Sequence, residues 1–147
     1  MKKWKARAFA DNGNNAPPSI GLTIQARKAF TYCNDNDLNC LIRAVSSIKD
    51  TFEEILDLPD LSFKWCLDVK LPVEPYKNVY YKMTKNQQDT FYNKIADLLK
   101  ALEQARDEES EVETSKILRK IFGDDFPQVE ATRKTNTVPY VPTGNSA

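Results

Sequence analysis

Residues 84–105, TKNQQDTFYNKIADLLKALEQA, begin with a helix-capping motif and continue with a helical pattern. Thr84 and Gln87 form a capping box, in which the hydroxyl and the glutamine side chain each satisfy a free backbone N–H at the helix start. Apolar residues then recur at steps of three and four, the spacing of one helical face. They are Phe91, Ile95, Leu98, Leu102 and Ala105. This stretch therefore predicts an amphipathic helix.

The first two expected helices are separated by a polar loop over residues 11–15. Residues 1–10 are mostly good helix formers and predict the end of a helix. Pro17-Pro18-Ser19 predicts the start of the next one, because a proline in the first turn has no N–H to leave unpaired. The expected apolar stripe of this second helix comprises Leu22, Ala26, Ala29, Phe30 and Cys33, widened by Ile20 and Ile24.

A third helix is predicted from Leu38 to Leu56, where apolar residues keep helical spacing until Pro59 ends it. Asn36 or Asp37 is its expected N-cap. A last short helix is predicted to open at a second capping box, formed by Ser110 and Glu113. Its inward-facing residues are Val112, Leu118, Ile121 and Phe122, and Gly123 stands where a C-cap glycine belongs.

Residues 63–73 alternate between apolar and polar, which predicts an extended segment with one buried face. Pro72 and Pro75 exclude a central position in a sheet. Residues 128–147 are rich in threonine, asparagine and proline, and predict a flexible tail. The expected fold class is mainly α: a bundle-like lobe of about five helices over residues 1–127, with one extended segment near 63–73 and a disordered C-terminal tail.

Composition limits the possible functions. The 147 residues fit one domain, and Lys+Arg and Asp+Glu are both 21, which argues against a dedicated DNA-coating or polybasic membrane protein. No apolar run approaches the roughly 20 residues of a membrane span, and no secretory signal is recognisable. The chain has no histidine, which excludes histidine bases and histidine metal sites. Cys33, Cys40 and Cys66 are expected to be reduced thiols in the cytoplasm.

The acidic motifs favour structural roles. Asp35-Asn36-Asp37 has the spacing of a two-metal phosphoryl-transfer site, but such carboxylates are usually held on a strand, and these stand between two helices. Helix capping is the preferred interpretation. Asp124-Asp125 follows a helix end and is best read as a solvated turn.

The basic N-terminus is the more informative cluster. Lys2, Lys3, Lys5 and Arg7 lie close in sequence to the helix that opens at Ser19, and a helix start offers free N–H groups and a positive dipole end to anions. Lysines beside such a helix start suit a triphosphate, while a solvated basic helix end is the simpler alternative. Five aromatic residues could stack on a base or belong to the core: Trp4, Trp65, Tyr76, Tyr80 and Tyr81.

Read in order, four segments resemble the C-terminal half of bacterial cyclic-oligonucleotide synthases, nucleotidyltransferases related to 2′-5′-oligoadenylate synthetase and cyclic GMP–AMP synthase. Residues 2–5, KKWK, resemble the end of that family's central helix, and residues 17–23, PPSIGLT, resemble its Pro-Ser helix start. Residues 71–75, LPVEP, followed by Asn78-Val79-Tyr80, Met83 and Gln87-Gln88-x-x-Phe91, resemble its late loop-to-helix junction. Residues 119–127, RKIFGDDFP, resemble its closing motif.

The resemblance implies a helical lobe that packs against an N-terminal catalytic lobe, with nucleotides in the cleft between them. It implies that Lys2, or Lys3 if the register slips, and Ser19 contact the triphosphate. Ile20 stands where relatives can carry an aromatic residue that stacks on the base. The family's catalytic Gly-Ser turn and the strand bearing paired acids have no counterpart in this chain, so no catalytic residue and no metal ligand is assigned. Mg²⁺ is expected only with bound nucleotide.

The expected function is therefore nucleotide binding by one lobe of a cyclic-oligonucleotide synthase of antiphage defence. Because Met1 falls inside what resembles a long helix, a truncated or split gene, or one half of a two-chain enzyme, is expected. The expected partners are nucleoside triphosphates and the missing catalytic lobe or partner chain, with no membrane and no specific nucleic acid. The chain alone is expected to be inactive. The alternative is a small helical protein-interaction module without a nucleotide.

Overall fold

The computed structural model describes residues 1–30 and 35–131, except for the side chains of residues 12–14. Within these ranges the fold is mainly α, with five α-helices and one small antiparallel sheet, which confirms the predicted class. The elements are α1 (Lys2–Ala8), the 3-10 helix η1 (Ala10–Asn15), α2 (Ser19–Ala29), α3 (Asp37–Lys49), β1 (Phe52–Asp57), β2 (Ser62–Leu67), α4 (Lys85–Asp107) and α5 (Glu111–Phe122).

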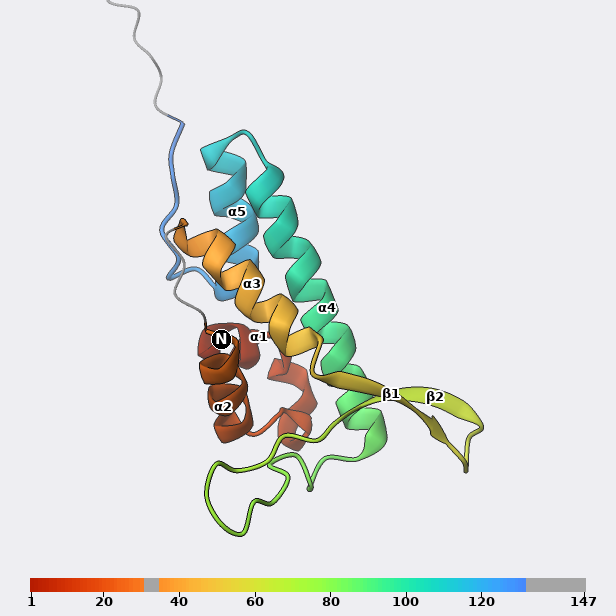
Figure 1. Ribbon diagram of the computed structural model, residues 1–147. Coiled ribbons are helices and arrows are strands. Elements are labelled where there is room, and N and C mark those ends of the chain that lie inside the picture. Colours follow the sequence, from red (N-terminus) through yellow and green to blue (C-terminus); the bar gives the residue numbers. More distant parts are fainter. Residues whose placement is uncertain (31–34, 132–147) are drawn as a thin grey trace, which may run out of the picture.

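Helix α4 is the centre of the lobe. It contacts α3, α5 and β2, while α2 packs on α3 and α1 packs on α5 (Figure 1). The β1–β2 hairpin projects from the helical body beside the N-terminal part of α4. One α4 face is buried along its length, which confirms the stripe of Phe91, Ile95, Leu98, Leu102 and Ala105.

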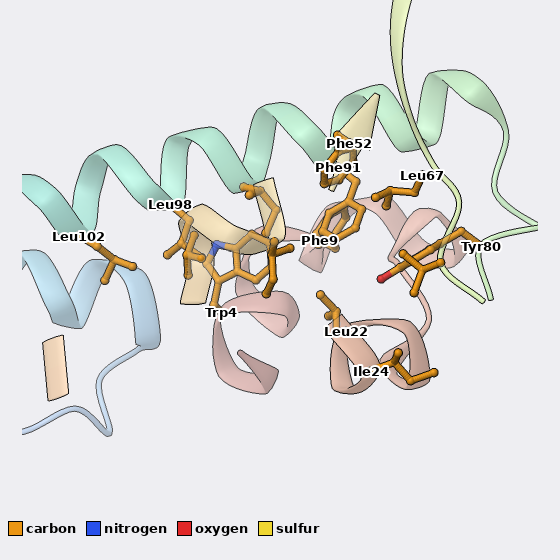
Figure 2. Packing of buried hydrophobic residues seen from close by; sticks show 14 of the residues in the cluster. Trp4, Phe9, Leu22, Ile24, Phe52, Leu67, Tyr80, Phe91, Leu98 and Leu102 are labelled. Carbon is orange, nitrogen blue, oxygen red and sulfur yellow. The ribbon is translucent and has the colours of Figure 1, made fainter. Parts of the chain in front are cut away.

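The core joins both ends of the sequence. Trp4 and Phe9 of the N-terminal segment pack edge to face, and Phe9 and Phe52 each pack against Phe91 of α4 (Figure 2). The same cluster includes Leu22 of α2 and Tyr80 of the long loop, which spans residues 68–84 between β2 and α4. Because these residues come from distant segments, one cooperative core holds α1, α2 and α4 in fixed relative positions.

The predicted third helix is too long. Helix α3 ends at Lys49, and Phe52 begins a strand that pairs with Leu67 at one end, while Asp57 pairs with Ser62 at the other. The apolar spacing at the end of residues 38–56 fits a strand as well as a helix. The backbone groups of these last residues are satisfied by pairing with residues 62–67 rather than by continuing α3. The predicted extended segment over 63–73 is correct only in part, since β2 ends at Leu67.

Several local predictions are confirmed. The capping box of Thr84 and Gln87 opens α4, and Ser110 accepts the N–H of Glu113 at the start of α5. Gly123 is the C-cap of α5 with φ +103°. Residues 11–15, predicted as a polar loop, instead form most of η1.

Other predictions need correction. Helix α2 ends at Ala29, so Phe30 is exposed rather than part of the apolar stripe. Cys66 has a free thiol, as predicted, whereas Cys40 is disulfide-bonded. The prediction of a reduced thiol is therefore wrong for Cys40. Cys33 and residues 132–147 of the predicted tail lie outside the described residues. Among the residues described, no helix has the length and apolar character to cross a bilayer.

Candidate phosphate-binding site at the start of α2

The start of α2 offers free backbone donors. Its N-cap is Pro18, which provides no side-chain cap, and the Pro18 carbonyl accepts hydrogen bonds from Gly21 and Leu22 at 3.1 and 3.3 Å. The first N–H groups of any helix lack intrahelical acceptors and form the positive end of its dipole. In this 11-residue helix they belong to the turn that begins at Ser19. An anion is the natural ligand for such a turn.

Helix α1 brings lysines to this turn. The Lys5 ammonium donates a hydrogen bond to the Ser19 hydroxyl oxygen, with 2.9 Å between nitrogen and oxygen. Lys2 precedes Lys5 by three positions and therefore lies on the same side of α1. Together with Ser19 they line a depression of about 170 Å³. Its full lining is Met1, Lys2, Lys5, Ser19, Leu22, Thr23 and Ala26.

Lys3 lies elsewhere. It forms an exposed ion pair with Asp125, beyond the end of α5, and this hydrogen bond lowers the pKa of the Asp125 carboxyl. Of the three residues expected to contact phosphate, the structure therefore brings Lys2 and Ser19 together and leaves Lys3 out of the depression. Lys5 is the lysine that sequence reasoning missed as a specific contact. Its three-residue step from Lys2 is the signal that could have identified it.

The depression has the electrostatics of an anion site. Among the residues that the structure describes, its lining contains two lysines and two hydroxyl side chains but no carboxylate. Leu22 and Ala26 form apolar walls, and a nearby apolar surface strengthens the attraction between a lysine and a phosphate by excluding water. The volume is well below the roughly 300 Å³ of a typical small-molecule pocket, so it suits phosphate groups rather than a whole nucleotide.

A buried chain of contacts holds α2 in place behind this site. Gly21 packs directly on the Tyr80 ring, where an added Cβ would lie 2.5 Å from the ring atom Cζ. The Tyr80 hydroxyl donates to the Gln25 side-chain oxygen, and Gln25 donates to the Thr51 hydroxyl at 2.8 Å. Burial raises the pKa of Tyr80, which therefore stays neutral. Gly21 and Tyr80 thus fix the position of the turn that carries Ser19.

The aromatic residues do not line the depression. Trp4 and Tyr80 are buried in the core, and Trp65 stacks on Tyr92 with 4.1 Å between ring centroids. Tyr76 and Tyr81 are exposed on the long loop. Ile20, the residue after Ser19, is also exposed. The core interpretation is therefore confirmed for Trp4 and Tyr80.

The acidic motifs form no metal centre in the described part of the chain. Asn36 caps α3 by accepting the Asn39 N–H at 2.9 Å, which confirms the capping interpretation. Hydrogen bonds from Asn39 and from the Asn36 N–H lower the pKa of Asp35. Asp124 is exposed. In residues 1–30 and 35–131, no three His, Cys, Asp or Glu side chains gather as metal ligands would.

Comparison of the chain with models of known protein families, and with curated proteins, gives no match.

Proposed function

We propose that this chain binds the phosphates of a nucleoside triphosphate at the start of α2, as the C-terminal lobe of a nucleotidyltransferase that makes cyclic oligonucleotide second messengers in antiphage defence. The observation that carries the proposal is the contact between Lys5 and Ser19. It places an ammonium and a hydroxyl beside the free N–H groups of a helix start. The resemblance of residues 17–23 to the Pro-Ser helix start of that enzyme family supports the same assignment.

Phosphate oxygens would take over the hydrogen bonds that Lys5 and Ser19 now make with each other. Lys2 would supply a second charge, and the first N–H groups of α2 would donate to the same oxygens. Because the depression holds phosphates only, the base and ribose need a second wall. We assign that wall to a catalytic lobe, in a longer chain or in a partner.

Mg²⁺ enters the proposal only with the nucleotide. The described lining of the depression contains no carboxylate, so these residues suit the phosphates rather than the metal ion. When bound, Mg²⁺ neutralises phosphate charge and orients the triphosphate for attack. Since the acids that hold Mg²⁺ in the resembled family have no counterpart in this sequence, we expect the 147-residue chain alone to form no cyclic product. The proposed location is the cytoplasm.

Isothermal titration of the chain with Mg·ATP, Mg·GTP and inorganic tripolyphosphate tests this proposal. We expect all three to bind, because the contacts are to phosphates. Replacement of Lys2 and Lys5 by alanine is expected to weaken binding at least about 10-fold, since a hydrogen bond to a charged group is worth about 1.5–3 kcal/mol. Lys3→Ala is the matched control and should leave the affinity unchanged. Equal loss of affinity in Lys3→Ala, or no binding of tripolyphosphate, would contradict the site.

One observation favours the alternative function, a protein-interaction module without nucleotide. The β1–β2 hairpin exposes several large apolar side chains. The alternative predicts no heat of binding with any of the three phosphates, together with association through the hairpin. The titration therefore separates the two functions.

A further inference from the structure

We infer that this chain self-associates head to tail, with the β1–β2 hairpin of one copy seated in the groove between α1, α4 and α5 of the next. The inference does not depend on nucleotide binding, because neither surface includes the depression at Ser19. Three observations support it. The hairpin exposes apolar side chains, the groove is apolar with basic residues around it, and the hairpin and the groove lie on opposite sides of α4.

The hairpin presents apolar side chains that folding does not explain. Leu56 and Phe63 pair across the two strands on one face, and Phe63 is 66% exposed. At the turn, Leu58 and Leu61 are 72% and 77% exposed. Leu61 also has φ +48°, a left-handed conformation that glycine or asparagine would adopt at lower cost. A cluster of this kind on a projecting element is typical of an interaction surface.

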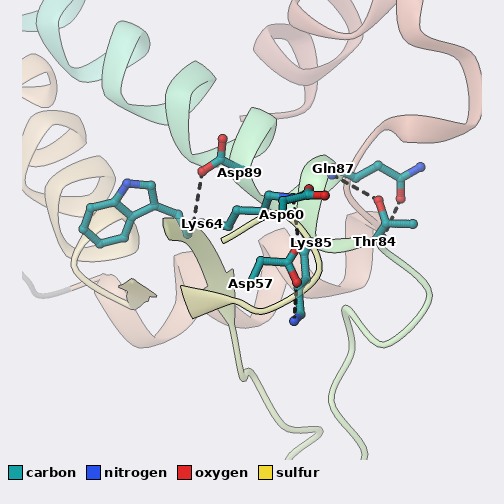
Figure 3. Close-up of polar contacts among 8 residues, drawn as sticks. Asp57, Asp60, Lys64, Thr84, Lys85, Gln87 and Asp89 are labelled. Carbon is teal, nitrogen blue, oxygen red and sulfur yellow. Dashed lines mark hydrogen bonds and ion pairs between the residues drawn. The ribbon is translucent and has the colours of Figure 1, made fainter. Parts of the chain in front are cut away.

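The hairpin is fixed to α4 close to its turn, because Asp57 is the last residue of β1. Lys64 and Lys85 both donate to the Asp57 carboxylate, at 2.7 and 2.9 Å, and thereby tie both strands to the start of α4 (Figure 3). The Trp65 N–H donates to Asp89 at 3.0 Å. Since these contacts fix the strands, the apolar side chains at the turn are displayed in one orientation, and binding them requires little further ordering.

The groove matches the tip in chemistry. It has a volume of about 550 Å³ and an apolar floor that includes Trp4, Leu98 and Ile121. In the described part of the chain, its charged lining residues are Arg7, Lys94 and Lys120, against a single acid, Asp97. On the hairpin, the exposed Glu54 lies on the same face as Leu56 and Phe63. In the proposed contact, the apolar side chains and Glu54 of one copy meet an apolar groove and its basic residues in the next copy.

A chain cannot fill its own groove. The hairpin contacts α4 through Gln88, which accepts the Leu67 N–H at 2.7 Å, and through Tyr92. Asp97 and Ala101 line the groove. At about 100° per residue of helix, these two pairs point to opposite sides of α4. The hairpin must therefore seat in a second copy, and the contact is heterologous, so each copy keeps one free hairpin and one free groove.

Sedimentation equilibrium of the full chain tests the inference. We expect wild-type chains to associate with increasing concentration, and more weakly at 500 mM than at 50 mM salt. Leu61→Asp places a charge on the apolar turn of the hairpin, and Ala101→Arg obstructs the groove. Each variant alone should therefore be monomeric. An equimolar mixture of the two should form a 1:1 dimer, because one intact hairpin meets one intact groove. Val73→Asp changes an exposed apolar residue outside both surfaces and should associate as wild type does.

Each other outcome overturns the inference. A wild-type chain that stays monomeric at every concentration excludes self-association. Association of Ala101→Arg with wild-type affinity points to hairpin–hairpin pairing instead. A mixture of the two variants that fails to dimerise shows that the hairpin does not seat in this groove. Far-UV circular dichroism checks that both variants fold. If Ala101→Arg does not fold, Lys120→Glu replaces it and should weaken association at least tenfold at low salt.

Discussion

The Lys5 ammonium lies 2.9 Å from the Ser19 hydroxyl oxygen, although 14 residues separate them in the chain. The contact joins two helices at the point where one exposes free N–H donors and the other carries positive charge. In the free chain this hydrogen bond is exposed, so it contributes little to stability. The contact matters because it brings the Lys5 ammonium of α1 to the start of α2, where the first N–H groups of that helix also donate.

Replacement of Ser19 by alanine should weaken binding of tripolyphosphate by about 10-fold or more, because one hydrogen bond to a charged oxygen is worth about 1.5–3 kcal/mol. Ser19→Thr keeps the hydroxyl and should retain the affinity. Isothermal titration measures both. If the threonine variant loses as much affinity as the alanine variant, the hydroxyl is not the contact.

Gly21→Ala should destabilise the lobe and also weaken phosphate binding. The new Cβ would lie 2.5 Å from the buried Tyr80 ring, and such overpacking typically costs about 1–3 kcal/mol. The shift of α2 that relieves it moves Ser19. Gly123→Ala is the control, since φ +103° makes it destabilising at a distance from the site. Urea unfolding should report a loss in both variants, and titration with tripolyphosphate a loss in Gly21→Ala alone.

Thr84→Ala should lower the free energy of unfolding by about 0.5–2 kcal/mol, because it removes the N-cap of α4. Thr90→Ala lies on the same helix, where the hydroxyl only bonds the carbonyl of Asn86, and should be close to neutral. Urea unfolding of both variants gives the comparison. A larger loss in Thr90→Ala would show that the cap is not what stabilises this helix.

Stability should fall in acid partly through Asp57. Hydrogen bonds from Lys64 and Lys85 lower the pKa of this carboxyl in the folded state. A lowered folded-state pKa stabilises the folded protein at pH values above the ordinary Asp pKa of about 3.9. This stabilisation is lost as the pH falls from that value through the folded-state pKa. Asp57→Asn should therefore be less stable than wild type at pH 7 and show a flatter pH dependence below pH 4. Urea unfolding across this range measures it, and parallel curves for the two proteins would contradict it.

Local signals predicted much of the fold. The capping box at Thr84, the C-cap glycine at Gly123 and the apolar stripe of α4 act within a few residues, so the sequence alone identifies them. The same holds for Asn36, whose side chain caps the next helix. At the candidate site, the proline-led helix start and the basic N-terminus are visible in the sequence, whereas Lys2 and Ser19 are singled out by the resemblance to the enzyme family.

Tertiary structure alone decided where residues 52–57 belong. Their helical spacing extends that of α3, and only pairing with residues 62–67 turns them into a strand. It also separated Lys3, drawn to Asp125 across the lobe, from Lys5, which reaches Ser19. The physical reason is range: caps and helical periodicity depend on neighbours in sequence, whereas strand pairing and ion pairing depend on which distant segments the core brings together.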